Sequence, residues 1–129
     1  MTFRALAALS LAVAALATPA AAKPVKPFSV SALAAAQAHG DAVLVDAFAP
    51  WCPICRAQAP TIESMTTDPA YARVQILHLD YDHQAAEKKL LGIKMQSTLI
   101  AFHGRRETGR LVGVTDPAQI RQLAASSEK

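Results

Sequence analysis

The sequence is short of cysteine, of net charge and of long apolar stretches, and each shortage excludes a class of protein. Its 129 residues include two cysteines, too few for a scaffold of several disulfides or a zinc site with four thiolates. A formal net charge of +3, spread along the chain, is too weak to indicate nucleic-acid binding. The longest apolar block, about 13 residues, cannot cross a bilayer roughly 30 Å thick. We therefore expect a small, soluble protein of one domain.

Residues 1–22 differ from the rest of the chain and predict a secretory signal peptide. Arg4 supplies a positive charge, residues 5–17 are apolar and rich in alanine, and Pro19 ends the run. The alanines at positions 20–22 offer the small side chains that a signal peptidase requires. An uncleaved membrane anchor is the alternative, but the run is too short to span. Cleavage near Ala22 leaves one domain, residues 23–129, in an oxidising compartment, which in a bacterium is the periplasm.

Hydrophobic patterning along residues 23–129 predicts alternating strands and helices. The expected strands are 42–49, 74–79, 98–103 and 110–114, and residues 104–109 are expected to connect the last two as a hairpin. The expected helices are 31–39 with Ser31 as N-cap, 53–67 interrupted by Pro60, 84–91, and 116–126 opened by Asp116 and Pro117. Residues 23–27 are expected to be mobile. This order favours an α/β fold, a mixed central sheet with helices on both faces.

Both cysteines lie between the apolar strand 42–49 and the first turn of the helix that follows it. The free backbone N–H groups at a helix N-terminus favour a thiolate, so Cys52 is the expected nucleophile. Cys55, one turn further along, is close enough to form a disulfide and is expected to be shielded by the protein. An exposed nucleophile with a buried resolving thiol suits thiol–disulfide exchange through a mixed disulfide.

Three other interpretations of the cysteine pair are weaker. A purely structural disulfide would close a loop too short to restrict the unfolded chain much. A metal site would have to combine the two cysteines with His78 and His83, although His78 lies in an apolar strand pattern and the gap between the pairs is long. A nucleophilic hydrolase would need one cysteine and a partner histidine, not two thiols in one turn.

Residues 28–126 resemble the thioredoxin family. The resemblance rests on an apolar strand with an acid, a Trp-Cys-x-x-Cys motif and a proline five residues after the second cysteine, namely Asp46, Trp51, Cys52, Pro53, Ile54, Cys55 and Pro60. Downstream, the spacing of the family is kept by Leu79, Asp82, Gly92, Ile93, Phe102 and Gly113. The resemblance implies a thioredoxin fold and a protein-disulfide oxidoreductase. It implies no organic cofactor, because the cysteine pair itself carries the two electrons.

Two further roles follow from the resemblance. Asp46 would lie beneath Cys55 and move its proton, directly or through water, as an acid/base group. The alternative, an acid at a strand end facing solvent, fits poorly with the apolar run around Asp46. Trp51 would pack beside the active site, with a core aromatic as the alternative.

The sequence departs from the family at Ser97, which precedes Thr98 where the family usually has a cis-proline. A cis bond between Gln96 and a serine would cost about 3 kcal/mol, so we expect this loop to be trans or strained. Because substrate backbone normally pairs with this loop in the family, substrate handling is expected to differ. Without the proline ring, the site could release mixed disulfides slowly, or admit a soft metal ion beside Cys52 and Cys55.

His78 is the second departure, because the family commonly has a lysine close to the buried acid. A histidine titrates near neutral pH and could share a proton with Asp46. The alternative is an ordinary, half-buried strand histidine. The other histidines, His39, His83 and His103, lie at the ends of predicted elements and are assigned to the surface.

These observations together predict a periplasmic thiol–disulfide oxidoreductase that acts as a reductase, with oxidase function as the competing direction. The expected partners are cysteine-containing exported proteins and a membrane redox partner, and a monomer is expected. The alternative from another class is a non-catalytic thioredoxin-like module that binds a peptide, or a copper or zinc ion, through Cys52 and Cys55. Ser97 is the main support for that alternative.

Overall fold

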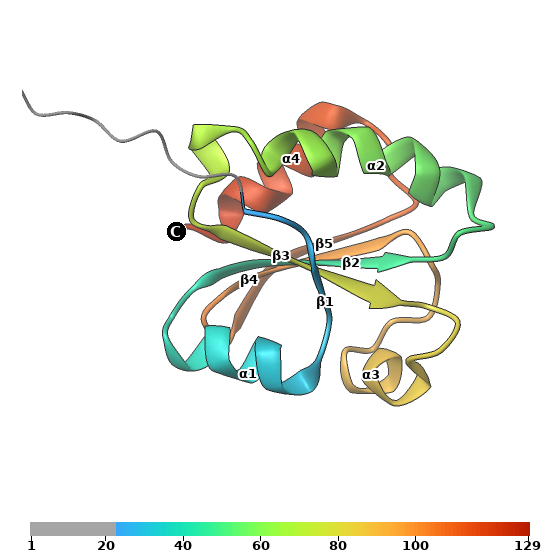
Figure 1. The fold of residues 1–129 in the computed structure, drawn as a ribbon, viewed down its shortest axis with the longest axis horizontal. Coiled ribbons are helices and arrows are strands. Elements are labelled where there is room, and N and C mark those ends of the chain that lie inside the picture. Colours follow the sequence, from blue (N-terminus) through green and yellow to red (C-terminus); the bar gives the residue numbers. More distant parts are fainter. Residues whose placement is uncertain (1–22) are drawn as a thin grey trace, which may run out of the picture.

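The computed structural model describes residues 23–129, which form one mixed β-sheet covered by helices on both faces (Figure 1). The predicted signal peptide, residues 1–22, lies outside the described residues. The strands are β1 (Lys26–Pro27), β2 (Ala42–Phe48), β3 (Val74–Asp80), β4 (Thr98–His103) and β5 (Arg106–Val112), in the order β1-β3-β2-β4-β5. β1, β3 and β2 are parallel, whereas β4 and β5 run antiparallel to their neighbours.

The helices cover the sheet in pairs (Figure 1). α1 (Val30–Ala38) and α3 (Ala85–Leu90) lie on one face, and α2 (Pro53–Met65) and α4 (Pro117–Ser126) lie on the other; a short 3-10 helix spans Pro69–Tyr71. The predicted α/β class, with a mixed central sheet and helices on both faces, is confirmed. None of the helices in residues 23–129 combines the length and the apolar character needed to cross a membrane.

Each face of the sheet has its own apolar core, and β2 contributes to both. Val43, Val45 and Ala47 pack on the α1 side, whereas Ala42 and Leu44 pack on the α2 and α4 side. This arrangement explains why the strand reads as one continuous apolar run, since both of its faces are covered. Asp46 continues the series that faces α2, so its carboxyl group points into the protein and not into solvent.

The expectation that residues 23–27 are mobile is wrong. Lys26 and Pro27 form β1, which pairs in parallel with Leu77 and His78 of β3 and covers that edge of the sheet. Lys23 N also donates to Thr66 O, at the C-terminal end of α2, over 3.1 Å. A proline and lysine composition suggested mobility, but these backbone hydrogen bonds hold the segment.

Two predicted boundaries also need correction. The hairpin turn is only Gly104 and Arg105, because Gly104 adopts a φ of +54° and β5 already begins at Arg106. The polar residues that follow lie in an edge strand, where one face meets solvent, so their polarity did not mark a loop. The N-cap of α1 is Ser29, whose side chain accepts from Ala32 N, and not Ser31.

Candidate active site

The two cysteines meet at the start of α2, as predicted. Cys52 is the N-cap residue, Pro53 is the first helical residue, and Cys52 Sγ accepts a hydrogen bond from Cys55 N over 3.1 Å. Cys52 and Cys55 form a disulfide, with their Cα atoms 5.3 Å apart. The first sulfur therefore lies at the positive end of the helix, where negative charge on sulfur is stabilised.

The prediction of an exposed nucleophile is wrong for this disulfide form. Cys52 is 0% exposed and Cys55 is 1% exposed. Cys52 Sγ is turned toward the helix N-terminus by its bonds to Cys55, and both cysteines pack with Ala49 against Phe48 and Tyr81. A partner sulfur can reach Cys52 only after a local movement of the surrounding chain.

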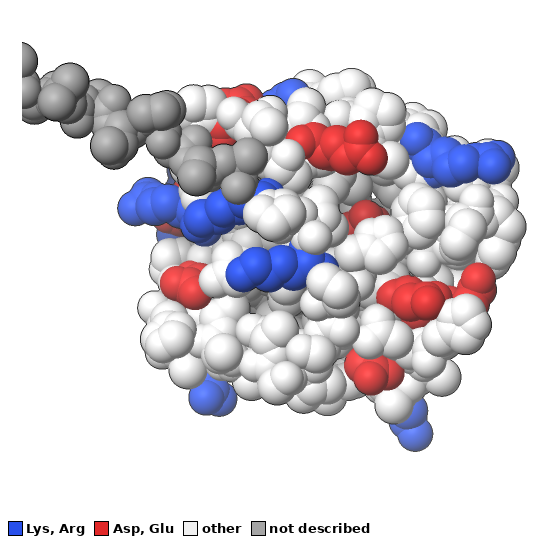
Figure 2. Space-filling view, in the orientation of Figure 1, with Lys and Arg blue, Asp and Glu red and all other residues white. Residues whose placement is uncertain are grey.

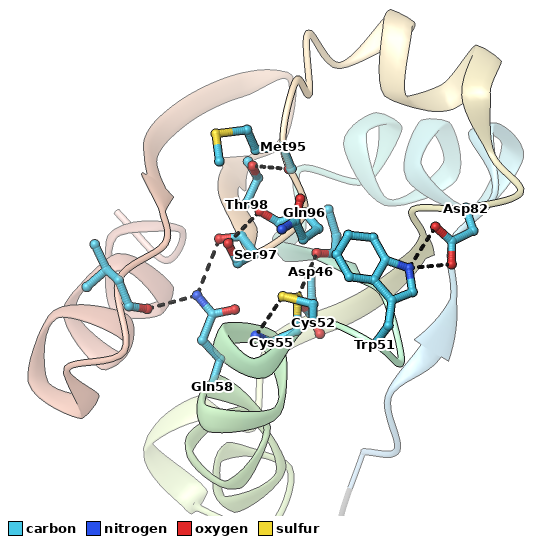
Figure 3. Close-up of a disulfide and its surroundings, with 12 residues drawn as sticks. Asp46, Trp51, Cys52, Cys55, Gln58, Asp82, Met95, Gln96, Ser97 and Thr98 are labelled. Carbon is cyan, nitrogen blue, oxygen red and sulfur yellow. Dashed lines mark hydrogen bonds between the residues drawn. A yellow bond between two sulfur atoms is a disulfide. The ribbon is translucent and has the colours of Figure 1, made fainter.

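Trp51 and Ile54 form exposed apolar surface next to the disulfide. The Trp51 side chain is 55% exposed, so it is not a core residue, and its Nε1 donates to Asp82 Oδ1 and Oδ2 over 3.1 and 3.0 Å (Figure 3). Asp82 keeps the spacing of the family, but the sequence indicates no role for it. A single carboxylate that accepts from an indole leaves no signal in one sequence, and the structure is needed to find it.

Asp46 and His78 form a pair behind the disulfide. They are register partners on β2 and β3, and His78 Nδ1 lies 3.3 Å from Asp46 Oδ2. Asp46 is 5% exposed and its Oδ1 has no hydrogen-bond partner, whereas the side chain of His78 is 37% exposed. Cys55 Sγ lies 3.9 Å from the carbonyl oxygen of Ala47, the residue after Asp46. The pair therefore connects the interior near Cys55 with the surface.

A cleft of about 220 Å³ opens between this pair and α2. Asp46 and His78 line one side, and Ile62 and Glu63 of α2 line the other. The lining is mostly apolar, and its polar side chains are Asp46 and His78 on one wall and Glu63 on the other. The volume is large enough for several water molecules. The arrangement could carry a proton between Asp46 and solvent.

The contact with Asp46 raises the pKa of His78 above 6.5, against the opposing effect of partial burial, and the charges of Asp46 and Asp80 act in the same direction as the contact. Protonated His78 therefore stabilises the folded state fully below pH 6.5, and this contribution is lost as the pH rises through the raised pKa. Between those limits, the free energy of unfolding should fall more steeply in the native protein than in His78→Gln. We expect a difference below about 1 kcal/mol, because the histidine is partly solvated.

Urea denaturation at several pH values measures this difference. The contact with Asp80, over 2.8 Å, also raises the pKa of His83, but this pair is present in both proteins, so its contribution cancels. Parallel stability curves for the two proteins would contradict the coupling of His78 to Asp46.

The loop before β4 was expected to be trans or strained, and it is both. No peptide bond in residues 23–129 is cis, and Ser97 has a φ of +59°, where a serine is uncommon. Ser97 is buried, its N–H donates to Ala47 O over 2.9 Å, and Thr98 Oγ1 donates to Met95 O over 2.7 Å. The loop is thus fixed against the end of β2, beside the disulfide (Figure 3).

Gln58 is a buried site residue that the sequence analysis missed. It follows Cys55 by three residues on α2, and Pro60 lies further along the same helix. Gln58 Nε2 donates to Ser97 O over 3.3 Å and to Val114 O over 2.8 Å. A polar residue on the apolar side of a predicted helix was the available signal.

The four-ligand metal site considered above is not assembled. In residues 23–129, no three His, Cys, Asp or Glu side chains are grouped as a metal ion would require. His78 contacts Asp46, and His83 contacts Asp80, at separate places.

His83 is exposed at the surface as predicted, whereas His103 is partly buried and its Nδ1 contacts Ser127 O. Charged side chains of both signs are interspersed on the face seen in Figure 2.

Comparisons with known proteins agree with this geometry. The thioredoxin family model matches residues 28–126. Thioredoxin-2 from Saccharomyces cerevisiae is 36% identical over 100 residues, which are 77% of this chain and 93% of that protein. Thioredoxin from Chlamydia muridarum is 34% identical over 86 residues, 67% of this chain and 82% of that protein.

A solved structure is similar over a comparable length. Trxlp from Edwardsiella tarda superimposes with a TM-score of 0.75 at 33% identity, covering 78% of this chain and 98% of that one. The thioredoxin of Malassezia sympodialis has a TM-score of 0.72 at 23% identity, which supports the fold.

Proposed function

Because this chain belongs to the thioredoxin family, we propose that its Cys52–Cys55 pair reduces disulfides of exported proteins. The chain is a thioredoxin-type thiol–disulfide oxidoreductase with a Cys-x-x-Cys active site. The observation that carries the proposal is the position of Cys52 Sγ at the N-terminus of α2, with Cys55 in disulfide contact behind it. Membership in an oxidoreductase family disfavours a non-catalytic module.

In the first step, the Cys52 thiolate of the reduced protein attacks one sulfur of a substrate disulfide. A mixed disulfide forms, the substrate S–S bond breaks, and the departing substrate thiolate takes a proton from solvent. The N-terminus of α2 stabilises the attacking thiolate, because Cys55 N points at Cys52 Sγ.

In the second step, Cys55 loses its proton and attacks Cys52 Sγ. The mixed disulfide breaks, the second substrate thiolate leaves and is protonated, and the Cys52–Cys55 disulfide forms. The substrate gains two electrons and two protons. Asp46 would accept the proton of Cys55 and pass it to the cleft at His78, because its carboxyl group is buried and belongs to the residue before Ala47, whose carbonyl oxygen Cys55 Sγ approaches.

Reduction of insulin disulfides tests the proposal directly. The protein with its active site reduced should reduce insulin, and Cys52→Ala should lose this activity. Turnover that is unaffected by the substitution would refute the proposal. The reduction potential of the cysteine pair then decides the direction, because a value near about −270 mV indicates a reductant and one near about −120 mV an oxidant.

Export is the second part of the proposal. It rests on the composition of residues 1–22, and it would place the protein in the periplasm, where a membrane redox partner would supply its electrons. We propose a monomer there, because the fold has a self-contained core. Intact mass of the protein recovered from cells checks this part, since a mature chain should begin at Lys23. A chain that retains residues 1–22 would contradict it.

A further inference from the structure

Gln58 joins three segments around the disulfide. Its backbone belongs to α2, and its carboxamide nitrogen donates to Ser97 O, before β4, and to Val114 O, after β5. The two hydrogens of one NH2 group therefore hold two different loops. Ser97 O also accepts from Gly113 N over 3.1 Å, which ties the two loops to each other.

The environment of Gln58 is unusual for a side chain that serves only packing. Gln58 is fully buried, and its Oε1 has no hydrogen-bond partner. An unpaired buried carbonyl costs free energy, so an apolar side chain of the same size would fit the core at no such cost. The nitrogen, not the carbonyl oxygen, therefore accounts for a glutamine at this position.

Ser97 explains why the loop needs such a contact. A φ of +59° is an unfavourable conformation for a serine, and it persists only where neighbouring groups impose it. Ser97 N is held by Ala47 O, and Ser97 O by Gln58 and Gly113. The three contacts fix both sides of the strained residue.

We propose that Gln58 is a positioning residue, which holds the loops around Ser97 and Val114 in the arrangement that a substrate chain contacts. The inference deepens the proposed function and rests on it. Met95 and Val112 are exposed apolar residues beside these loops, and Trp51 and Ile54 are exposed beside the disulfide. Fixing the loops in advance lowers the entropy lost when a protein substrate docks on this surface.

Gln58→Met tests the proposal, because methionine has a similar length and removes the two donors and the unpaired oxygen together. We expect the KM for insulin to rise about fivefold while kcat stays within about twofold, since docking and not sulfur chemistry is affected. The rate with a small disulfide, which needs no docking surface, should not fall. Hydrogen exchange at the amides of Ser97 and Gly113 should become faster. These amides donate to Ala47 O and Ser97 O, and both hydrogen bonds should open more often once Gln58 no longer holds the loops.

Gln75→Met is the matched control. Like Gln58, Gln75 donates from its carboxamide nitrogen, but to one partner, Asp41 Oδ2, over 2.7 Å. This contact lies at the opposite end of the sheet from the disulfide. This variant should keep the native KM for insulin and the native exchange rates at Ser97 and Gly113.

The outcomes separate this inference from the function on which it rests. If the native protein does not reduce insulin, both fail. If it does, and Gln58→Met has an unchanged KM and unchanged exchange, only the role of Gln58 is overturned. Gln58→Leu serves as a second variant, and failure of both variants to fold would assign Gln58 to the core and also overturn the proposal.

Discussion

Cys55→Ser should stop turnover and trap the substrate on the protein. Cys52 keeps its position at the N-terminus of α2 and can still attack a disulfide, but no second thiol remains to release the product. We expect insulin reduction to fall by more than about 10³-fold, because the two cysteines act as one unit. Mass spectrometry without reducing agent should reveal a mixed disulfide at Cys52.

Cys52→Ser is the matched variant for this experiment. It should be equally inactive, and no adduct should accumulate, because the helix N–H that stabilises a thiolate points at the N-cap position 52, whereas Cys55 Sγ faces the carbonyl oxygen of Ala47. An adduct at Cys55 in Cys52→Ser, with none in Cys55→Ser, would reverse the roles assigned to the two sulfurs.

Asp46→Ala should make the protein more stable and less active at the same time. The substitution removes a buried carboxylate whose Oδ1 has no partner, and His78 is exposed enough to be hydrated without it. We expect the free energy of unfolding to rise by about 1–3 kcal/mol. Turnover should fall by about 10²–10⁴-fold if Asp46 accepts the proton of Cys55.

Asp41→Ala is a control at the opposite end of the sheet. It removes the carboxylate that accepts from Gln75, so it should lower stability slightly and leave turnover unchanged. Native turnover in Asp46→Ala would exclude Asp46 from proton transfer, and a loss of stability would show that its contact with His78 outweighs its burial.

Long elements with a clear hydrophobic pattern could be predicted from the sequence. β2 is buried on both faces and reads as an apolar run, and α4 begins at Asp116 and Pro117 as its N-cap signal indicates. β1 could not be predicted, because two residues carry no periodicity and their pairing with β3 depends on tertiary contacts. The start of β5 was missed for a related reason, since an exposed edge strand can be as polar as a turn.

The site was predictable where the chemistry depends on neighbours in sequence. Cys52, Cys55 and the start of α2 belong to one turn, so their spacing determines their contact. The contact of Asp46 with His78 was predicted as one of two alternatives, because strand register is not visible in a single sequence. The burial of Cys52 and the contacts of Gln58 depend on side-chain packing between distant segments, which spacing does not determine.

The hydrogen bond between Lys23 N and Thr66 O fixes the N-terminal end of the folded domain at the C-terminal end of α2. Thr66 caps one end of α2 and Cys52 caps the other, so a helix about 20 Å long separates the attachment point from the reactive sulfur. A tag or second protein fused before Lys23, or a surface attached there, would lie at the end of α2 opposite Cys52. It would leave the approach to the disulfide unobstructed. Immobilisation through that end therefore suits this chain for capturing thiol partners.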